Sequence, residues 1–272
     1  MSKAQSKNMR LIAQHTLNGF GNMGEGMSLQ VTDDGRRVIW LAHESPPKNF
    51  SGVDVTDLNN PKMVVQTELP HQHVRSNSLE LSGDLLAVAY QTNALGLEPA
   101  GVEMFDVSDP ENPKSVGFFD CSGPKSRGVH CVWFVDGEYV HCAGADWPRI
   151  KFVVYNRVET NPFPISTLPM PAFEEFGGRP GRFGSHNLHE NRPGPSFQSD
   201  TVIIGNYFNA GIRVHELSNP FQPQEIAYYV PESPEGSRVG EIQINDVYVD
   251  EHQIVYGMDR FPGGLYILEM DI

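Results

Sequence analysis

Three stretches of the chain repeat one pattern, and this repeat decides the fold. They read SGVDVTDLNNPKMVV (51–65), AGVEMFDVSDPENPKSVG (100–117) and AGIRVHELSNPFQPQEIA (210–227). Each begins with a small residue and a glycine, continues with alternating apolar side chains, and ends in a polar turn with a proline. GGLYILEMDI (263–272) opens a fourth copy, and RIKFVVYNRVETNPFPIS (149–166) is a degenerate fifth. Apolar alternation with period two, bounded by turn residues, indicates paired β-strands.

Two further strand-like runs precede each copy. In the first repeat they are GMSLQVT (26–32) and RRVIWLAHE (36–44), joined by a turn at 33–35. With the run after the proline, each repeat holds four strands, and a period near 50 residues with four strands is typical of a β-propeller blade. We therefore predict an all-β fold, a five-bladed β-propeller of four-stranded antiparallel blades, as one domain spanning 1–272.

The two ends of the chain complement each other in this scheme. The run Leu11–Leu17 precedes the first blade, and the last repeat stops before a fourth strand. We expect Leu11–Leu17 to supply the outer strand of the final blade and to close the ring, because closure removes exposed sheet edges.

The repeat also carries a family resemblance. The phrases GVDVTDLNNP (52–61), GVEMFDVSDPENP (101–113) and GIRVHELSNPFQP (211–223), with GGLYILEMD (263–271), resemble the LVIVD-repeat β-propeller proteins. The resemblance covers nearly the whole chain and implies the propeller fold. It implies little about function, because the repeat itself is scaffold.

Composition narrows the classes of function. The net charge of −14 argues against binding of DNA or RNA, since a phosphate backbone would be repelled. No run approaches the roughly 18 apolar residues that span a bilayer, so no membrane partner is expected. The start, MSKAQSKNMR followed by LIAQHTL, is too short and too polar for a signal-peptide core, which predicts a cytoplasmic protein. The oligomeric state stays open.

Unusual residues gather where first strands would line the central channel. The aligned position holds Met27, Asn77, His130, His186 and Asn245, and the next holds Ser28, Ser78, Cys131, Asn187 and Asp246. Imidazoles and amides stand where the strand would otherwise continue its apolar alternation. We expect these side chains to converge at one mouth of the channel.

A metal centre is the leading interpretation of this column. Neutral imidazole is a common ligand for zinc, copper and iron, and separate blades can each present one ring to a shared point. We predict that His130 and His186, with His71 and His73 from the preceding loop, hold a divalent transition metal (Fe, Zn, Mn or Cu). The carboxylates expected to orient the rings are Glu25, Glu44, Glu80, Glu190 and Asp246. The alternative is that each histidine is a channel residue bonded to water or a carbonyl.

Further roles follow from position. The candidate catalytic residues are His189, Asn245 and Asp246, and the candidate substrate-binding residues are Arg75, Asn77 and Arg182. The segment 173–183, rich in glycine and aromatic residues, precedes His186 and is either a lid over the mouth or a plain insertion loop.

The sequence thus predicts a metal-dependent enzyme acting on a small organic substrate. Hydrolase, lyase and oxygenase chemistry all stay open. The chain contains no G-x-S-x-G nucleophile elbow, no phosphate-binding loop and no dinucleotide-binding motif. The alternatives are a non-catalytic propeller that binds a ligand or serves as a scaffold, and a metal-storage or sensing module.

Overall fold

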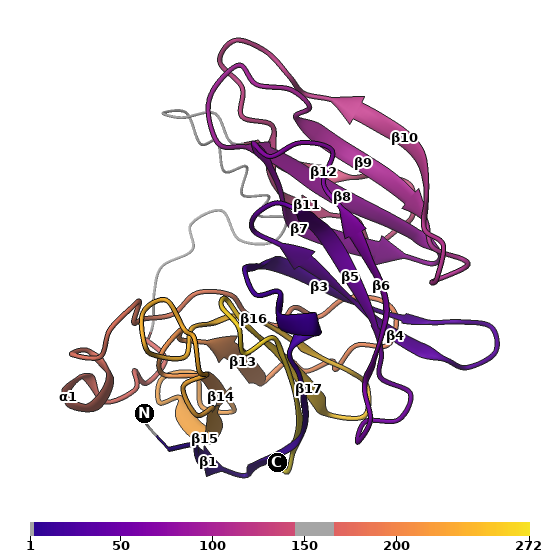
Figure 1. Ribbon diagram of the computed structural model, residues 1–272. Helices are drawn as coiled ribbons and strands as arrows, with labels where there is room; N and C mark the ends of the chain where they lie inside the picture. The colour runs from indigo at the N-terminus through magenta and orange to yellow at the C-terminus, as the bar shows by residue number, and fades with distance from the viewer. Residues whose placement is uncertain (1–2, 145–165) are drawn as a thin grey trace.

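The computed structural model describes residues 3–144 and 166–272, and strands dominate it (Figure 1). The single α-helix of these residues, α1, spans Phe173–Phe176. The prediction of an all-β fold is confirmed. No helix in the described part of the chain is both long and apolar enough to cross a membrane.

The first two repeats form two four-stranded antiparallel meanders. The first consists of β3 (Met23–Val31), β4 (Arg37–His43), β5 (Lys48–Asp54) and β6 (Lys62–Glu68). The second consists of β7 (Val74–Ser82), β8 (Leu85–Thr92), β9 (Gly101–Asp106) and β10 (Lys114–Asp120). A single bridge between His43 and Ser76 joins β4 to β7. Both sheets match the predicted repeat.

The third repeat is described only in part. Its first two strands are β11 (Val129–Trp133) and β12 (His141–Gly144), which pair with each other. The degenerate repeat copy at 149–166 lies outside the described residues except for Ser166.

The fourth and fifth repeats form the sheets shown in orange and yellow in Figure 1. The fourth holds β13 (Val202–Asn206), β14 (Ile212–Glu216) and β15 (Gln224–Val230), and the fifth holds β16 (Ile244–Val249), β17 (Ile254–Asp259) and β18 (Leu265–Met270). The predicted inner strand of the fourth repeat is irregular, with one isolated bridge from Leu188 to Gly205.

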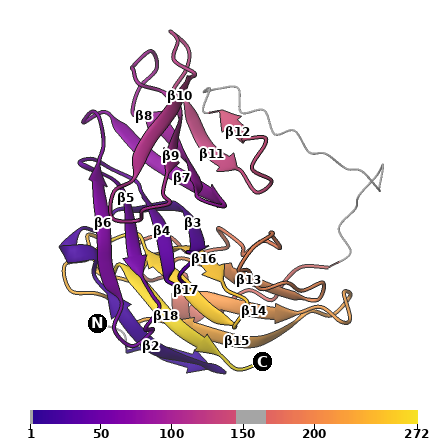
Figure 2. The ribbon, with the colours of Figure 1, turned by 90° about the vertical axis from the view of Figure 1, so that its right-hand side faces the viewer.

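The amino-terminal segment adds an outer strand to both of these sheets. Strand β2 (Met9–His15) pairs antiparallel with β18, as Figure 2 shows, and β1 (Gln5–Lys7) pairs with β15. The second pairing is absent from the sequence prediction. The predicted strand also ends too late, because Leu17 and Asn18 have positive φ and belong to the short 3-10 helix η1 (Leu17–Gly19).

Among the described residues, hydrophobic cores join the first sheet to the second, the second to the third, the fourth to the fifth and the fifth to the first. Trp40 and Phe50 of the first sheet meet Phe105 of the second, and one core likewise joins the fourth sheet to the fifth. Another core joins the fifth sheet to the first, where Leu41 and Met258 are fully buried. Sheets stacked in this way around a shared channel have the architecture of a β-propeller.

The repeated turns form the same hydrogen bonds in different copies. The side chain of Asp54 accepts the backbone N–H of Thr56 at 2.9 Å, and Asp106 accepts that of Ser108 at 2.9 Å. Short acidic side chains stabilise turns in this way. The glycine that opens each copy has a steric cause, because a Cβ at Gly101 would lie 2.0 Å from the carbonyl oxygen of Phe119 on the next strand.

Candidate functional site

The described inner strands all break register at the same level of the channel. The irregularities lie between Met23 and Met27 in β3, Ser76 and Leu79 in β7, Val129 and Cys131 in β11, and Ile244 and Asp246 in β16. In a regular strand, successive side chains point to opposite faces, whereas a bulge re-aims one of them. Polar residues from both aligned positions therefore reach the channel.

Glu25 occupies the centre of the resulting cluster. It stands between Gly24 and Gly26 in β3. A Cβ at Gly24 would lie 2.6 Å from the carbonyl oxygen of Asn77, and one at Gly26 would lie 2.3 Å from the backbone nitrogen of Leu79. The two glycines thus let β3 press against β7, which brings the carboxylate of Glu25 into the channel.

Two imidazoles from different sheets face this carboxylate. The Nε2 atom of His130 lies 3.5 Å from Oε2 of Glu25, and Nε2 of His186 lies 3.4 Å from Oε1. The side-chain amide of Asn77 donates to Oε2 at 3.3 Å. The column predicted from the sequence therefore brings Asn77, His130 and His186 together, with Glu25 among them.

The opposite nitrogen of each ring lies within hydrogen-bond distance of an oxygen acceptor. Nδ1 of His186 lies 2.8 Å from the backbone carbonyl of Asn245, which only accepts, so this nitrogen carries the proton. Nδ1 of His130 lies 3.1 Å from Oε1 of Gln91, an oxygen that also accepts Nε of Arg75 at 2.8 Å, and 3.4 Å from the side-chain amide nitrogen of Asn77. In neutral His186 the Nε2 lone pair therefore points at Glu25, and the same holds for His130 when its Nδ1 donates to Gln91; this arrangement calls for a proton or a cation between ring and carboxylate.

Burial and charge shift the pKa values of this cluster. Although burial alone would raise it, the hydrogen bond from His186 and the charges of both imidazoles lower the pKa of Glu25 to about 2. Burial would lower the pKa of His186, but Glu25 and the carbonyl of Asn245 raise it. Burial lowers the pKa of His130, against the pull of Glu25. Glu25 is thus a carboxylate with strong affinity for positive charge.

The donor set suits a transition metal ion. Ligand atoms of Glu25, His130 and Cys131 all lie within 4.8 Å of one another, the one such group of three found in residues 3–144 and 166–272. His186 lies outside that group, across the carboxylate. Two atoms bound to one ion at 2.0–2.1 Å in tetrahedral geometry are about 3.3–3.4 Å apart, which is close to the separation of Nε2 of His130 from Oε2 of Glu25, whereas Nε2 of His186 faces the other oxygen, Oε1. Imidazole and carboxylate ligands suit zinc, iron, manganese and copper.

The structure does not bring His71 and His73 to this cluster. Both lie on the loop before β7, where their rings stack with centroids 5.2 Å apart. Nε2 of His73 contacts the carbonyl of Glu98. No contact with Glu25, His130 or His186 is found for the pair in the described chain.

His189 points away from the cluster, as expected for a strand residue three positions after His186. Its Nδ1 accepts the backbone N–H of Val249 at 3.1 Å, and its Nε2 donates to the carbonyl of Phe197 at 2.9 Å. Burial lowers its pKa to about 4. Nδ1 therefore joins the segment 189–197 to the fifth sheet, and Nε2 ties the two ends of that segment together.

Of the remaining predicted residues, Asn245 bridges two sheets, because its amide donates to the carbonyls of Met23 at 3.2 Å and Gly24 at 2.7 Å. This fixes the strand that carries Glu25. Arg75 donates to Oε1 of Glu44 at 2.7 Å.

Arg182 lies at the end of the segment 173–183, with its guanidinium 5.4 Å from the centre of the Phe208 ring. The segment 173–183 is anchored by Phe176, which is 2% exposed. Whether it acts as a lid stays a prediction.

Asp246 lines a cavity of about 140 Å³ in the channel, together with Glu25, Ser78, Cys131 and Asn187. Its Oδ1 accepts the amide of Asn187 at 3.2 Å and the N–H of Val247 at 2.9 Å. No cation pairs with it among the described residues. Burial and the charge of Glu190 raise its pKa to about 7.

This shift predicts a pH-dependent stability. The folded protein keeps the Asp246 proton up to a pH of about 7, whereas the unfolded chain releases it near pH 4. Between these values the free energy of unfolding falls with rising pH by about 1.4 kcal/mol per unit for this group, and above them it levels off. Asp246→Asn removes that slope. Urea unfolding of chelator-treated protein is expected to show the stability of the variant rising relative to that of wild type between about pH 4 and about pH 7; a constant difference would contradict this.

Sequence reasoning gave Glu25 only a supporting part and left out Gln91 and Phe208. Gln91 orients His130, and the ring of Phe208 packs on that of His186 with centroids 4.5 Å apart. The signal for Glu25 was present in Gly24-Glu25-Gly26, a charged residue between two glycines inside a strand. Gln91 and Phe208 carry no local signal, since both come from second strands or their loops.

Comparison with known proteins gives no family. No family model matches the chain, and no curated protein matches it, so the LVIVD-repeat resemblance is not confirmed.

Solved structures match it at low identity. They include the GH43 BlXynB protein from Bacillus licheniformis (13% identity, TM-score 0.40, 91% of this chain and 50% of that one) and a thermostable family-43 glycoside hydrolase (10%, 0.41, 93% and 89%). A third is the periplasmic gluconolactonase PpgL of Pseudomonas aeruginosa (14%, 0.31, 91% and 70%). This chain thus spans half the length of the first.

Proposed function

We propose that this protein is a metal-dependent enzyme acting on a small organic substrate at the mouth of the channel. A divalent transition metal would be held by His130 and Glu25, with His186 and Cys131 completing the set. The observation that carries the proposal is the pair of imidazoles whose Nε2 atoms both face one carboxylate, while each Nδ1 atom lies within hydrogen-bond distance of an oxygen acceptor. Hydrogen bonds of this kind orient histidine ligands in metal sites.

The surrounding residues have separate tasks in this proposal. A bound divalent ion supplies a Lewis acid that polarises a carbonyl or activates water at neutral pH. Asn77 steadies the carboxylate of Glu25, and Asn245 fixes both His186 and the strand of Glu25. Asp246, with a pKa of about 7 in the same cavity, is able to hold or release a proton near neutral pH. His189 is not assigned a catalytic role, because its ring is bonded to the backbone on both sides.

The five-blade count belongs to the same proposal. Residues of all five repeats line the channel cavity. We propose that the third repeat completes a blade with residues beyond β12, and that the pairing of β2 with β18 closes the ring.

Elemental analysis of protein purified without a histidine tag tests the metal. We expect close to one equivalent of a transition metal in wild type and less than about a tenth in the variant His130→Ala/His186→Ala, because removing ligands forfeits affinity. The matched control is His71→Ala/His73→Ala. It also removes two imidazoles, but from the loop before β7, and is expected to retain the metal.

Two outcomes would count against the proposal. Wild type that holds no metal after incubation with Zn²⁺, Fe²⁺, Mn²⁺ or Cu²⁺ would favour the non-catalytic binding propeller. Loss of metal from the His71/His73 variant alone would move the centre to the loop before β7. The metal content of the single variants Cys131→Ser and His186→Ala then shows how much each of these two residues contributes to metal binding.

A further inference from the structure

Positive charge is concentrated at the mouth of the channel, above the imidazoles. Arg75 and Arg260 both donate to Oε1 of Glu44, Arg75 at 2.7 Å. Arg182 acts electrostatically on both Glu44 and Arg260. Three guanidinium groups therefore face two carboxylates, those of Glu44 and Glu25, which leaves an excess of positive charge here in a protein whose net charge is −14. Such a local reversal of sign draws anions to a cleft.

Hydrogen bonds to Glu44 fix the positions of two of these arginines, Arg75 and Arg260. The side chains of Arg75 and Arg260 are 26% and 17% exposed, so both are partly removed from water. Burial and the neighbouring guanidiniums lower the pKa of Arg260, in spite of Glu44. A substrate carboxylate would offset the repulsion between Arg260 and the neighbouring guanidinium groups. Arg75 and Arg260 already bind one carboxylate, that of Glu44.

Arg182 is the third arginine of this group, and it does not bond to Glu44. It is exposed and has no carboxylate partner among the residues that the structure describes. It lies over the ring of Phe208, at 5.4 Å, and Phe208 in turn packs on the ring of His186. The chain thus places an unpaired guanidinium one aromatic ring away from the imidazole of His186.

We infer that the substrate is a small organic acid whose carboxylate is bound by Arg182 and Arg260, with its reacting group directed toward His130, Glu25 and His186. The direction of the reacting group toward the metal ligands rests on the proposed function. The binding of the carboxylate by the two arginines needs no metal. The planar fork of arginine matches a carboxylate through two parallel hydrogen bonds. Arg75 takes part through Glu44, which it shares with Arg260.

Calorimetric titration of the whole protein with succinate tests the inference. We expect binding to wild type, at least tenfold weaker binding to Arg182→Gln, and a smaller loss with Arg182→Lys, which keeps the charge but not the fork. The matched control is Arg10→Gln, which removes an exposed arginine from the outer strand β2 and is expected to bind like wild type. Succinamide, the uncharged analogue, is expected not to bind.

Three results would overturn it: no succinate binding to wild type, equal binding to wild type and Arg182→Gln, or binding of inorganic phosphate in preference to succinate. Metal content measured on the same samples separates the two proposals. Metal without succinate binding refutes the anion site alone, and Arg182-dependent succinate binding without metal refutes the metal centre alone. Thermal unfolding of Arg182→Gln shows whether the variant is folded, and Arg182→Lys carries the test if it is not.

Discussion

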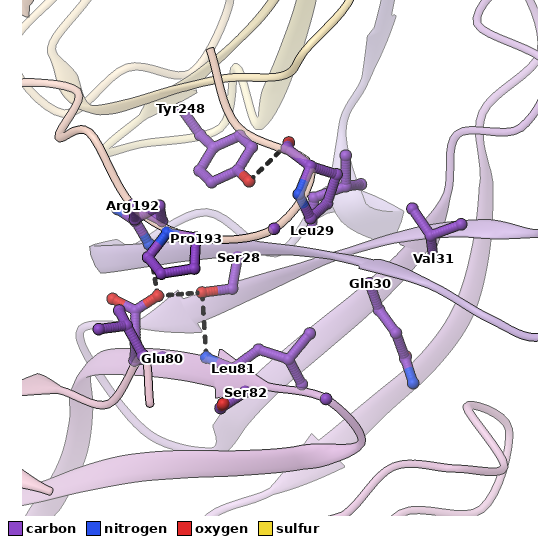
Figure 3. A pocket seen from close by; sticks show the side chains of 14 residues that line it. Ser28, Leu29, Gln30, Val31, Glu80, Leu81, Ser82, Arg192, Pro193 and Tyr248 are labelled. Atoms are coloured by element: carbon purple, nitrogen blue, oxygen red, sulfur yellow. Dashed lines mark hydrogen bonds and ion pairs between the residues drawn. The ribbon is translucent and has the colours of Figure 1, made fainter. Parts of the chain in front are cut away.

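Replacing Arg192 by alanine is expected to lower the free energy of unfolding by about 3–5 kcal/mol, the usual cost of leaving a buried charge without its partner. The side chains of Arg192 and Glu80 are 10% and 6% exposed, and they form an ion pair inside the channel. Ser28 donates to the same carboxylate oxygen of Glu80 at 2.9 Å. Figure 3 shows the pair, with Ser28, at the wall of a cavity of about 280 Å³.

Arg192 also contacts the inner strands of several sheets at once. Its guanidinium carbon lies 5.7 Å from the centre of the Trp133 ring and 5.1 Å from that of Tyr248, and Nη1 donates to the carbonyl of Met27 at 3.4 Å. One side chain from the fourth repeat thus contacts residues of the other four. Its loss removes packing as well as charge.

Urea unfolding monitored by fluorescence measures the effect, with Arg238→Ala as the control for loss of one arginine. The double variant Arg192→Ala/Glu80→Gln is expected to recover part of the loss, because burial raises the pKa of Glu80 to about 7 and glutamine carries no charge to desolvate. A loss below about 1 kcal/mol, the range of exposed ion pairs, would show that the pair is solvated in solution.

The second large effect is expected at Glu25. Glu25→Gln keeps the shape of the side chain but removes the charge that both imidazoles face. We expect its affinity for Zn²⁺ to fall by about 100-fold or more, beyond the 10–100-fold typical of residues that only support a ligand. Competition with a chromophoric chelator gives the dissociation constants.

Glu235→Gln, which neutralises an exposed acid elsewhere, controls for the change in net charge. An unchanged affinity in Glu25→Gln would exclude Glu25 as a ligand and leave the imidazoles and Cys131. A parallel fall in both variants would mean that the measured ion binds through general electrostatic attraction rather than at the centre.

Much of the fold could be predicted from the sequence because the repeat is local. Alternation and turn residues place the strands, and hydrogen bonds such as those from Asp54 and Asp106 recur within a few residues. The second partner of the amino-terminal segment could not be predicted, since β1 meets β15 more than 200 residues away and nothing in Gln5–Lys7 indicates which sheet edge it joins.

In the candidate site, too, some residues could be predicted from the local repeat, whereas others depend on how the strands pack. His130 and His186 follow from aligning the repeats, but the bulges that re-aim their neighbours depend on how the inner strands pack. That is why Glu25, two positions before the aligned Met27, becomes the centre, while His71 and His73 lie together on a loop. Arg192 carries no local signal, since its reach into the channel is a property of the assembled fold.

The pairing of β2 with β18 has a consequence for how the molecule forms. Residues near the start of the chain find their partners only when positions 265–270 have left the ribosome, so this contact spans almost the entire length and closes late. Until then the edge of the last sheet is open to any extended segment, including the same segment of a second nascent copy. Exchange of these arms between two chains is therefore the misassembly to which this topology is most exposed.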